Sequence, residues 1–228
     1  MTVQSKTALV IGASGGIGSA VLSTLRGNPS YGNCFGLSRR DDGLDVTREA
    51  TLEAAAKDLS GHQFDLIFIA TGVLATSGGG PEKSFKALNA EAMSEAIAVN
   101  AIGPALAIKH FAPLLARDRR AVFAALSARV GSIGDNRLGG WIGYRASKSA
   151  LNQIMRCAAI EFGRTHKQAV FAALHPGTIE TGLSSPFARG RFTARPEEAA
   201  ARLLRVLDQL EPEESGGFFA YDGDRIEW

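Results

Sequence analysis

A tyrosine and a lysine four residues apart, Tyr144 and Lys148 in the segment YRASK, could together form a proton-donating site. Residues at this spacing are neighbours on one face of a helix. A free tyrosine hydroxyl has a pKa of about 10, and an adjacent cation typically lowers it by about 1 to 3 units, toward the range useful for proton exchange at neutral pH. We therefore expect a lowered pKa for Tyr144.

A serine usually completes a site of this kind, but the places where we would look for it hold Ala128 and Gly131. Ser127 is adjacent, yet successive strand side chains point to opposite faces, so Ser127 should face away if position 128 faces the substrate. Ser132 lies in the following loop, where this alternation does not apply. We therefore expect Ser132, rather than Ser127, to be the catalytic serine. A site with neither would lose about 2.7 to 4 kcal/mol of transition-state stabilisation.

A glycine-rich turn, GASGGIG, follows the first apolar run and opens a helix. Glycine permits positive backbone dihedrals and the close approach of a pyrophosphate, whose charge a helix N-terminus can bind. The glycine spacing differs from the standard GxGxxG fingerprint, and a tight turn without a ligand would also use glycine. The position between strand and helix favours dinucleotide binding, with Gly12, Ser14, Gly16, Ile17 and Gly18 as the expected contacts.

The second apolar run ends at Ser38, Arg39 and Arg40, where an NAD-binding fold places an acidic side chain against the ribose. An acid there would repel a 2′-phosphate, whereas an arginine can bind it. The sequence therefore favours NADP(H) over NAD(H), with Ser38 and Arg39 as contacts. The alternative is that both arginines are solvated loop charges, neutralised by Asp41 and Asp42.

Short apolar runs alternate with segments of helical spacing along almost the whole chain. This alternation is typical of a parallel sheet covered by helices on both faces. We expect a single doubly wound α/β domain of the Rossmann type, residues 1–228, with its ligands beyond the carboxyl ends of the strands. The expected strands are Thr7–Ile11, Cys34–Leu37, Asp65–Ala70, Ala121–Leu126, Ala169–Leu174 and Phe218–Tyr221, and the expected helices Gly16–Arg26, Arg48–Leu59, Ala90–Ala116, Tyr144–Gly163 and Pro196–Leu210.

One connection in this pattern is short. Only RRDDGL separates Ser38 from Asp45, where a third strand would begin, and a crossover helix needs about ten or more residues. Either the helix between the second and third strands is missing or the third strand is vestigial. We expect the helix to be missing.

The bulk composition limits the partners. The formal net charge is +2 and the basic residues are scattered, so neither nucleic acid nor a membrane is expected, and no apolar run looks long enough to span a bilayer. The histidines have no ligand spacing, so no metal site is expected, and His175 should be structural. Cys34 and Cys157 lie in apolar runs typical of buried free thiols. Together these features favour a cytoplasmic protein.

Taken together, the motifs resemble those of the short-chain dehydrogenase/reductase family over nearly the whole chain. The likeness rests on the glycine turn, Asp45 and Val46, Asn100 in AVNAIGP, the YRASK segment, and HPGTIET. The segments GSIGDNRLGGWIGYRASKSALN and GGFFAYDGDRIEW are similar to the branch of bacterial C-factor (C-signal) and Sniffer-like carbonyl reductases. One loop departs from the family, because IATG stands in place of NNAG, although Gly72 is retained.

The resemblance implies a role for each matching residue. Tyr144 would protonate a carbonyl oxygen, Lys148 would hold the cofactor ribose, and Asn100 would position a water that relays protons to Lys148. Singly, each residue also has a structural explanation, such as Asp45 as a turn or helix cap before Thr47. The further implied cofactor contacts are Asp45 and Val46 near the adenine, Ile179 and Thr181 at the carboxamide, Pro176 and Gly177 in the same turn, and Gly72.

The implied function is that of an oxidoreductase, an NADPH-dependent reductase of a small ketone or aldehyde that is reversible as an alcohol dehydrogenase. Trp141 and Phe187 are candidate pocket walls, and Ser184 to Phe192 form a candidate substrate lid. The displaced serine suggests a second hypothesis, an NAD(P)-binding signalling or redox-sensing protein with little catalysis. The family also implies a homodimer or homotetramer, formed through the two long helices that begin at Ala90 and Tyr144.

Overall fold

Six strands form one parallel sheet in the computed structural model, which describes residues 5–188 and 190–228. In space the strands follow the order β2, β1, β3, β4, β5, β6, and each neighbouring pair is parallel. The carboxyl ends of all strands therefore lie along one edge, and the strand order reverses beside β1. The strands are β1 (Lys6–Ile11), β2 (Tyr31–Leu37), β3 (Leu66–Ile69), β4 (Ala121–Leu126), β5 (Ala169–His175) and β6 (Gly217–Ala220).

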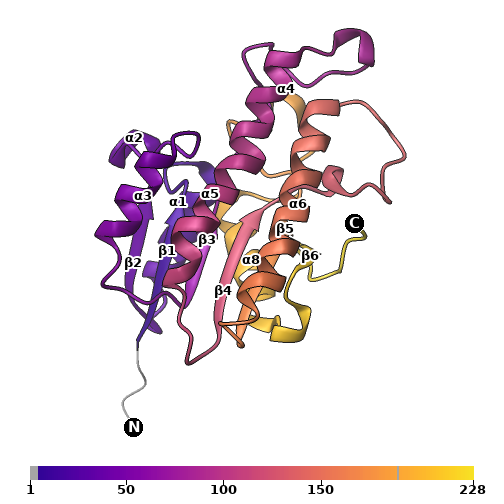
Figure 1. Cartoon of the computed structure of the whole chain (residues 1–228). Coiled ribbons are helices and arrows are strands. Elements are labelled where there is room, and N and C mark those ends of the chain that lie inside the picture. Colours follow the sequence, from indigo (N-terminus) through magenta and orange to yellow (C-terminus); the bar gives the residue numbers. More distant parts are fainter. Residues whose placement is uncertain (1–4, 189) are drawn as a thin grey trace.

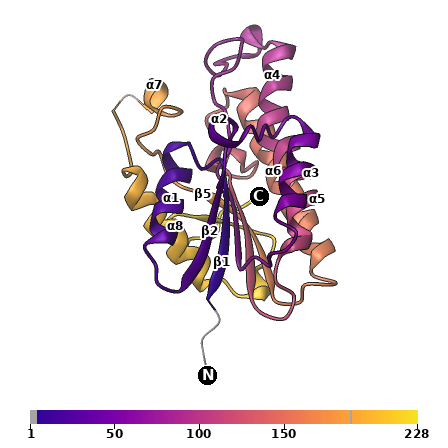
Figure 2. The same cartoon turned by 90° about the vertical axis from the view of Figure 1, so that its left-hand side faces the viewer.

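Helices cover both faces of this sheet, which confirms the doubly wound parallel architecture (Figures 1 and 2). The helices α1 (Gly16–Arg26) and α8 (Pro196–Gln209) pack together on one face. On the other face lie α3 (Glu49–Asp58), α5 (Gly103–Phe111) and α6 (Ile142–Phe162). Above the carboxyl edge, α4 (Ala90–Ile97) and the short α7 (Ser185–Ala188) rise beyond the sheet.

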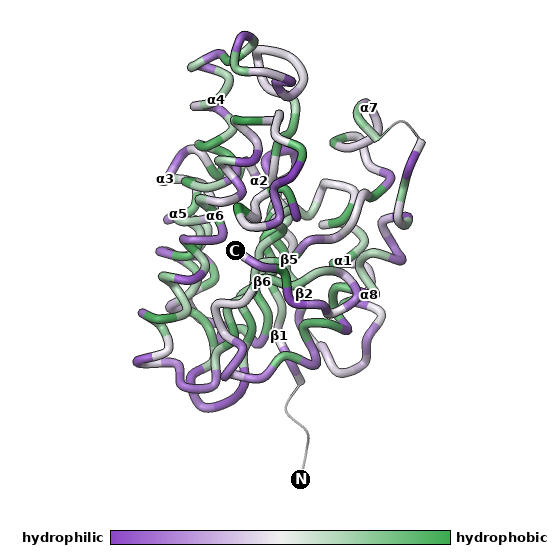
Figure 3. The backbone as a smooth tube through the Cα atoms, turned by 90° about the vertical axis from the view of Figure 1, so that its right-hand side faces the viewer, coloured by the Kyte–Doolittle hydropathy of each residue, from purple (hydrophilic) through white to green (hydrophobic). Residues whose placement is uncertain are grey.

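The central strands are buried on both faces, so they read as nearly continuous apolar runs, whereas the edge strand β2 is only partly buried. All residues of β3, β4 and β6 are buried. Alternate side chains feed two separate clusters, and on the face covered by α5 and α6 the rings of Phe123 and Phe171 stack with centroids 5.4 Å apart. Figure 3 shows the same arrangement, with hydrophobic colour along the central strands and hydrophilic colour in the loops around them.

The short connection after β2 contains no third strand at Asp45. Instead, the one-turn helix α2 (Arg39–Asp42) follows Ser38 directly, and the chain then reaches α3 before it returns to the sheet as β3. The sequence allows either a missing helix or a vestigial third strand. The described residues fit the vestigial strand, because no strand forms at Asp45. The physical reason is that α3 already supplies the crossover between two parallel neighbours.

The helical stretch Ala90–Leu114 contains an irregular turn. Between α4 and α5 the residues Ala98–Ile102 form a π-helical turn, which places an extra residue in the helix. By length and composition alone this stretch could cross a membrane, so the expectation that no segment is long enough is wrong. A core helix of a soluble protein passes the same test, and α5 carries buried residues against α3 and α6.

The two cysteines are less buried than the sequence indicates. Cys34 in β2 is half-buried and Cys157 in α6 is exposed, and both are free thiols. Cys34 lies in a strand at the edge of the sheet, and Cys157 lies on the solvent side of its helix. The expectation of buried thiols is therefore wrong for Cys157, because an apolar run in a helix still has one face toward solvent.

Candidate active site

The two residues of the YRASK segment that could do chemistry lie in the first turns of α6. The helix begins after Trp141, which adopts a left-handed backbone conformation with a φ of 51°. Lys148 is buried, and its Nζ donates a hydrogen bond to the carbonyl oxygen of Leu126, 2.8 Å away at the end of β4. The same Nζ lies 5.8 Å from the centroid of the Tyr144 ring. The expected pairing on one helix face is therefore present.

Asn100 joins this pair from the π-helical turn. Its side chain is fully buried, and its Oδ1 accepts a hydrogen bond from the backbone N–H of Val73 at 2.8 Å. Its Nδ2 donates to the Val73 carbonyl oxygen at 2.9 Å and to the Ser147 hydroxyl at 3.0 Å. A Cβ built on Gly72 would lie 3.2 Å from Asn100 Oδ1 and 3.6 Å from Lys148 Nζ, so these groups surround one point.

Burial dominates the electrostatics of this centre. It raises the pKa of Tyr144 to about 12, so the expected lowering of that pKa is wrong for the protein by itself. It also lowers the pKa of Lys148 to about 8, because a buried ammonium lacks the solvation that water gives. Desolvation is the only cause of the pKa shift at Tyr144, and no lowering contribution from Lys148 offsets it.

Neither serine candidate takes the place that the sequence suggests. Ser132 is buried, and its Oγ accepts a hydrogen bond from the Asp135 N–H at 3.0 Å. It is absent from the walls of the cavities that Tyr144 lines. The structure thus does not bring Ser132 to the site, because its hydroxyl is engaged in a hydrogen bond within its own loop. Ser127 does contribute to two of those walls, but its Oγ donates to Asn152 Oδ1 at 2.6 Å.

Two of the three cavities that Tyr144 lines share a wall. One, of about 330 Å³, is lined by Gly15, Gly16, Thr71, Gly72 and Lys148 among others. The other, of about 570 Å³, opens toward α7 and is mainly apolar, with Trp141, Leu183 and Phe187 in its wall. The two share a set of wall residues, which are Ile17, Ser127, Tyr144, Pro176, Thr181 and Leu183.

The glycine turn fits a pyrophosphate. Gly12 has a φ of 89°, and a Cβ on Gly18 would lie 2.2 Å from the Gly12 carbonyl oxygen, so both positions require glycine. The helix α1 begins after Gly15 with no side-chain cap and no acidic residue in its first turn. Its first N–H groups are therefore open to an anion. Ser14 is half-buried within the same turn.

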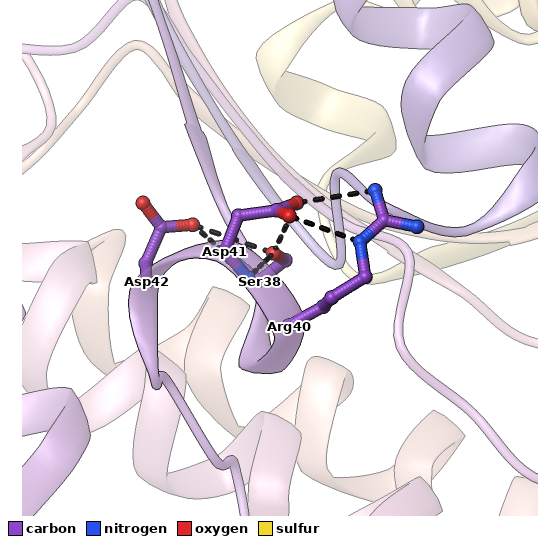
Figure 4. Close-up of polar contacts among 4 residues, drawn as sticks. All are labelled: Ser38, Arg40, Asp41 and Asp42. Carbon is purple, nitrogen blue, oxygen red and sulfur yellow. Dashed lines mark hydrogen bonds and ion pairs between the residues drawn. The ribbon is translucent and has the colours of Figure 1, made fainter.

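The segment after β2 forms a small polar network around the one-turn helix α2 (Figure 4). The Ser38 hydroxyl caps this helix by accepting from the Asp41 N–H at 3.0 Å, and it donates to Asp41 Oδ2 at 2.9 Å. The Arg40 guanidinium pairs with Asp41 at 2.9 Å, while the Asp42 carboxylate accepts from the Ser38 N–H. Arg39 is exposed and has no ion pair within the described residues.

The two residues expected near the adenine have local structural roles. Asp45 accepts hydrogen bonds from Thr47, at 2.9 Å from its N–H and 2.7 Å from its hydroxyl, and these hold the pKa of the carboxyl below its usual range. Val46 is buried, and a Cβ on Gly103 would lie within 2.9 Å of its side chain. The local turn explains the contacts of Asp45, and packing against α5 explains those of Val46.

The loop after β5 lies beside the tyrosine. Gly177 has a φ of 87°, which glycine adopts without strain, and Pro176 precedes it on the walls of both cavities. Ile179 is buried, and Thr181 packs so closely that a Cβ on Gly16 would lie 2.7 Å from its methyl group. The HPGTIET segment and the glycine turn therefore face each other across the smaller cavity.

The aromatic residues that the sequence suggests as pocket walls do line the larger cavity. The Trp141 ring makes edge-on contacts with Tyr144 and with Phe187, with centroids 6.2 and 6.4 Å apart, and so links the start of α6 to α7. The candidate lid Ser184 to Phe192 thus lies over the larger cavity, although residue 189 lies outside the described residues.

Two polar groups were not expected at the site. Thr71 Oγ1 is buried without a hydrogen-bond partner within the described residues, and so is His175 Nδ1. Both residues line one of the cavities. Thr71 lies in the IATG departure from the family pattern, which was the one available signal. Among residues 5–188 and 190–228, no three His, Cys, Asp or Glu side chains gather as a possible metal site.

Comparison with known proteins places this geometry in a family. The sequence profile described as enoyl-(acyl carrier protein) reductase matches residues 43–224. The 1-hydroxy-2-glutathionyl-2-methyl-3-butene dehydrogenase of Rhodococcus sp. (strain AD45) is 32% identical over 97% of this chain and 99% of its own length. The C-signal protein of Myxococcus xanthus is 33% identical over 60% of this chain and 78% of its own.

Solved structures agree on the fold. Carbonyl reductase Sniffer of D. melanogaster superposes with a TM-score of 0.85 at 18% identity, covering 99% of this chain and 100% of that one. The NADPH-bound carbonyl reductase from chicken fatty liver gives a TM-score of 0.82 at 24% identity, covering 98% and 99% of the two chains. With a tyrosine, lysine and asparagine gathered beneath a glycine turn, this chain belongs to the short-chain dehydrogenase/reductase family of oxidoreductases.

Proposed function

We propose that this oxidoreductase is an NADPH-dependent reductase of small ketones or aldehydes, reversible as an alcohol dehydrogenase. The observation that carries the proposal is the position of Tyr144, on a wall shared by the cavity beside the glycine turn and the mainly apolar cavity beneath α7. A cofactor held in the first cavity and a carbonyl compound in the second would therefore both reach the tyrosine. A mainly apolar cavity of about 570 Å³ suits a small molecule.

The residues around the tyrosine would manage the proton. A nicotinamide bound beside Ile17 and Thr181 would supply hydride to the carbonyl carbon. The Tyr144 hydroxyl would donate its proton to the carbonyl oxygen as a general acid. Lys148, with a pKa lowered to about 8, can exchange a proton near neutral pH and would supply the tyrosine again. Asn100 is held in the π-helical turn by hydrogen bonds to Val73 and Ser147, and we propose that it holds the relaying water.

The choice of NADP(H) over NAD(H) rests on Arg39. It is exposed beyond the end of β2 and has no ion pair within the described residues, whereas the adjacent Arg40 is paired with Asp41. A free guanidinium there can bind a 2′-phosphate through charge-assisted hydrogen bonds. The network in Figure 4 keeps Asp41 and Asp42 engaged with Ser38 and Arg40, so they repel such a phosphate less than free carboxylates would.

A test of this function uses the variant Tyr144→Phe, which removes only the hydroxyl. A panel of small ketones and aldehydes would be screened for NADPH oxidation by the wild-type protein, and the best substrate would then be used for both proteins. We expect the variant to lose about 10²- to 10⁴-fold in kcat while NADPH binding, followed by fluorescence, stays intact. Full turnover by the variant would reject the mechanism.

A second candidate function is supported by Ala128, which leaves no serine hydroxyl at the expected position in the cavity wall. A cofactor-binding signalling or redox-sensing protein would tolerate this loss. The same screen decides, because such a protein would bind NADPH yet oxidise none of it across the whole carbonyl panel. Appreciable turnover would reject the second candidate.

We also propose that the protein is cytoplasmic and forms a homodimer or homotetramer through the long helices. Two exposed isoleucines support the oligomer, Ile102 in the π-helical turn before α5, 51% exposed, and Ile160 in α6, 54% exposed. Light scattering on the purified chain would measure the mass in solution. A monomeric mass at micromolar concentration would reject the oligomer.

A further inference from the structure

His175 occupies a position that connects the missing serine with the substrate cavity. It ends β5, and the register pairs Leu174 with Leu126 of β4. The backbone N–H of Ser127 donates to the Leu174 carbonyl oxygen at 2.7 Å, so the next residues on the two strands, Ser127 and His175, lie side by side. His175 lines the larger cavity together with Ala128 and Tyr144.

The imidazole of His175 is neutral at physiological pH. Burial lowers its pKa to about 4, the charge of Arg129 acts in the same direction, and Asp222 opposes them more weakly. A neutral imidazole has one N–H donor and one bare nitrogen. This ring is therefore able to donate a hydrogen bond without carrying a charge, as a serine hydroxyl does.

The ring nitrogens of His175 have different surroundings. Nδ1 is sealed from solvent and has no hydrogen-bond partner within the described residues, so a proton there would be a buried orphan donor, which native structures rarely contain. We therefore assign the proton to Nε2. Nε2 is not among the sealed and unpartnered atoms, and it is the polar atom that the ring can present to the cavity.

We propose that His175 donates a hydrogen bond from Nε2–H to the substrate carbonyl oxygen, in place of the serine that the family would have at Ala128. The inference rests on the proposed reductase function. As hydride adds to the carbonyl carbon, the electron pair of the C=O π bond moves to the oxygen, which takes its proton from Tyr144. His175 keeps its own proton throughout and stabilises the negative charge that develops on the oxygen.

The test compares His175→Leu, His175→Gln, Ala128→Ser and the double variant His175→Leu/Ala128→Ser. Each is measured for kcat and KM on the best carbonyl substrate, for NADPH binding and for thermal unfolding. Glutamine can place an N–H near the position of Nε2, whereas leucine cannot. The Ala128→Ser change restores a hydroxyl to the cavity wall, so it acts as an internal rescue.

We expect His175→Leu to lower kcat by about 10²- to 10³-fold, the usual effect of losing one donor to a developing oxyanion, with NADPH affinity within about twofold of wild type. His175→Gln should retain more activity than His175→Leu. Ala128→Ser should raise kcat at least about tenfold more in the His175→Leu background than in the wild-type background.

Two results would overturn the inference. One is a folded His175→Leu protein with unchanged kcat, and the other is a His175→Leu loss that Ala128→Ser leaves untouched, which would mean that the histidine acts through packing. If His175→Leu fails to fold, His175→Ala, which also lacks a donor, takes its place and is measured with and without Ala128→Ser. Failure of the proposed reductase function is distinct, because it appears as full turnover by Tyr144→Phe or as no turnover by the wild-type protein.

Discussion

At the amino edge of the sheet, polar groups are held by partners within the chain. The Asp65 carboxylate accepts from the Thr7 N–H at 2.8 Å and from the Arg119 guanidinium at 2.6 Å. Arg120 donates to the carbonyl oxygens of Leu207 and Leu210 at the end of α8. The carboxyl edge differs, because Thr71 Oγ1 and His175 Nδ1 are buried there without partners.

The comparison teaches where this fold places stability and where it places function. A satisfied buried carboxylate stabilises the packed state, whereas an unpaired buried polar group costs free energy unless a ligand meets it. The division is not complete, since His166 Nε2 near the amino edge also lacks a partner within the described residues. We therefore expect substitutions at the carboxyl edge to reduce activity, and substitutions at the amino edge to reduce stability.

The largest effect should follow from Lys148→Met at the carboxyl edge. It removes the buried ammonium beside Tyr144, and we expect kcat/KM for carbonyl reduction to fall by about 10²- to 10⁴-fold. Methionine removes a buried charge, so the thermal unfolding midpoint should not fall along with the activity. The matched control is Lys109→Met. It alters an exposed lysine on α5 that pairs with Glu49 of α3. Equal activity losses in the two variants would break the comparison.

The same lysine should give the stability of the protein a distinct pH dependence. Its pKa is lowered from 10.5 to about 8 on folding, so between these pH values the unfolded chain binds more protons than the folded one. The free energy of unfolding attributable to Lys148 therefore rises as the pH increases from about 8 to 10.5, by up to about 3 kcal/mol. Below pH 8 the burial penalty is fully present.

This dependence can be isolated by urea unfolding of wild type and Lys148→Met at pH 7 and pH 10. The wild-type protein should gain stability relative to the variant as the pH increases, since other titrating groups are common to both. A constant difference between the two proteins would show that folding does not lower the pKa of Lys148.

At the amino edge, Asp65→Asn should destabilise the fold by about 2 kcal/mol, because Arg119 loses its carboxylate partner in a largely buried setting. The Asp65 side chain is only 6% exposed. Specific activity per folded molecule should stay at the wild-type level. The control Asp118→Asn removes the other, exposed carboxylate bound to Arg119 and should change the unfolding midpoint little. An activity loss from Asp65→Asn without destabilisation would reverse the comparison.

The smallest effect concerns the cofactor. Arg39→Ser should raise the KM for NADPH about tenfold and leave that for NADH nearly unchanged, because only NADPH carries a 2′-phosphate. Arg40→Ser is the matched control, since this arginine is already paired with Asp41. Steady-state kinetics with both cofactors measure the effect. If Arg40→Ser has the larger effect on NADPH, the phosphate contact lies on the other side of α2.

Much of the fold could be predicted because its signals are local. The apolar runs of β1, β3, β4 and β5 lie within a residue or two of the observed strands, since strands buried on both faces need continuous apolar sequence. The absent strand at Asp45 could not be predicted from its six-residue connection, because whether a segment pairs depends on partners distant in the sequence. For the same reason Ala90–Ala116 reads as one regular helix, although a π-helical turn at Asn100 interrupts it.

The candidate site divides in the same way. The sequence by itself determined the glycine turn, the Tyr144 and Lys148 pair and the Asn100 position, because helix spacing and glycine geometry are properties of neighbouring residues. Only the tertiary structure decided that Ser132 turns into a local hydrogen bond, that burial raises the pKa of Tyr144 to about 12, and that His175 reaches the cavity. Burial and strand register depend on contacts between segments far apart in the chain, and those contacts exist only once it has folded.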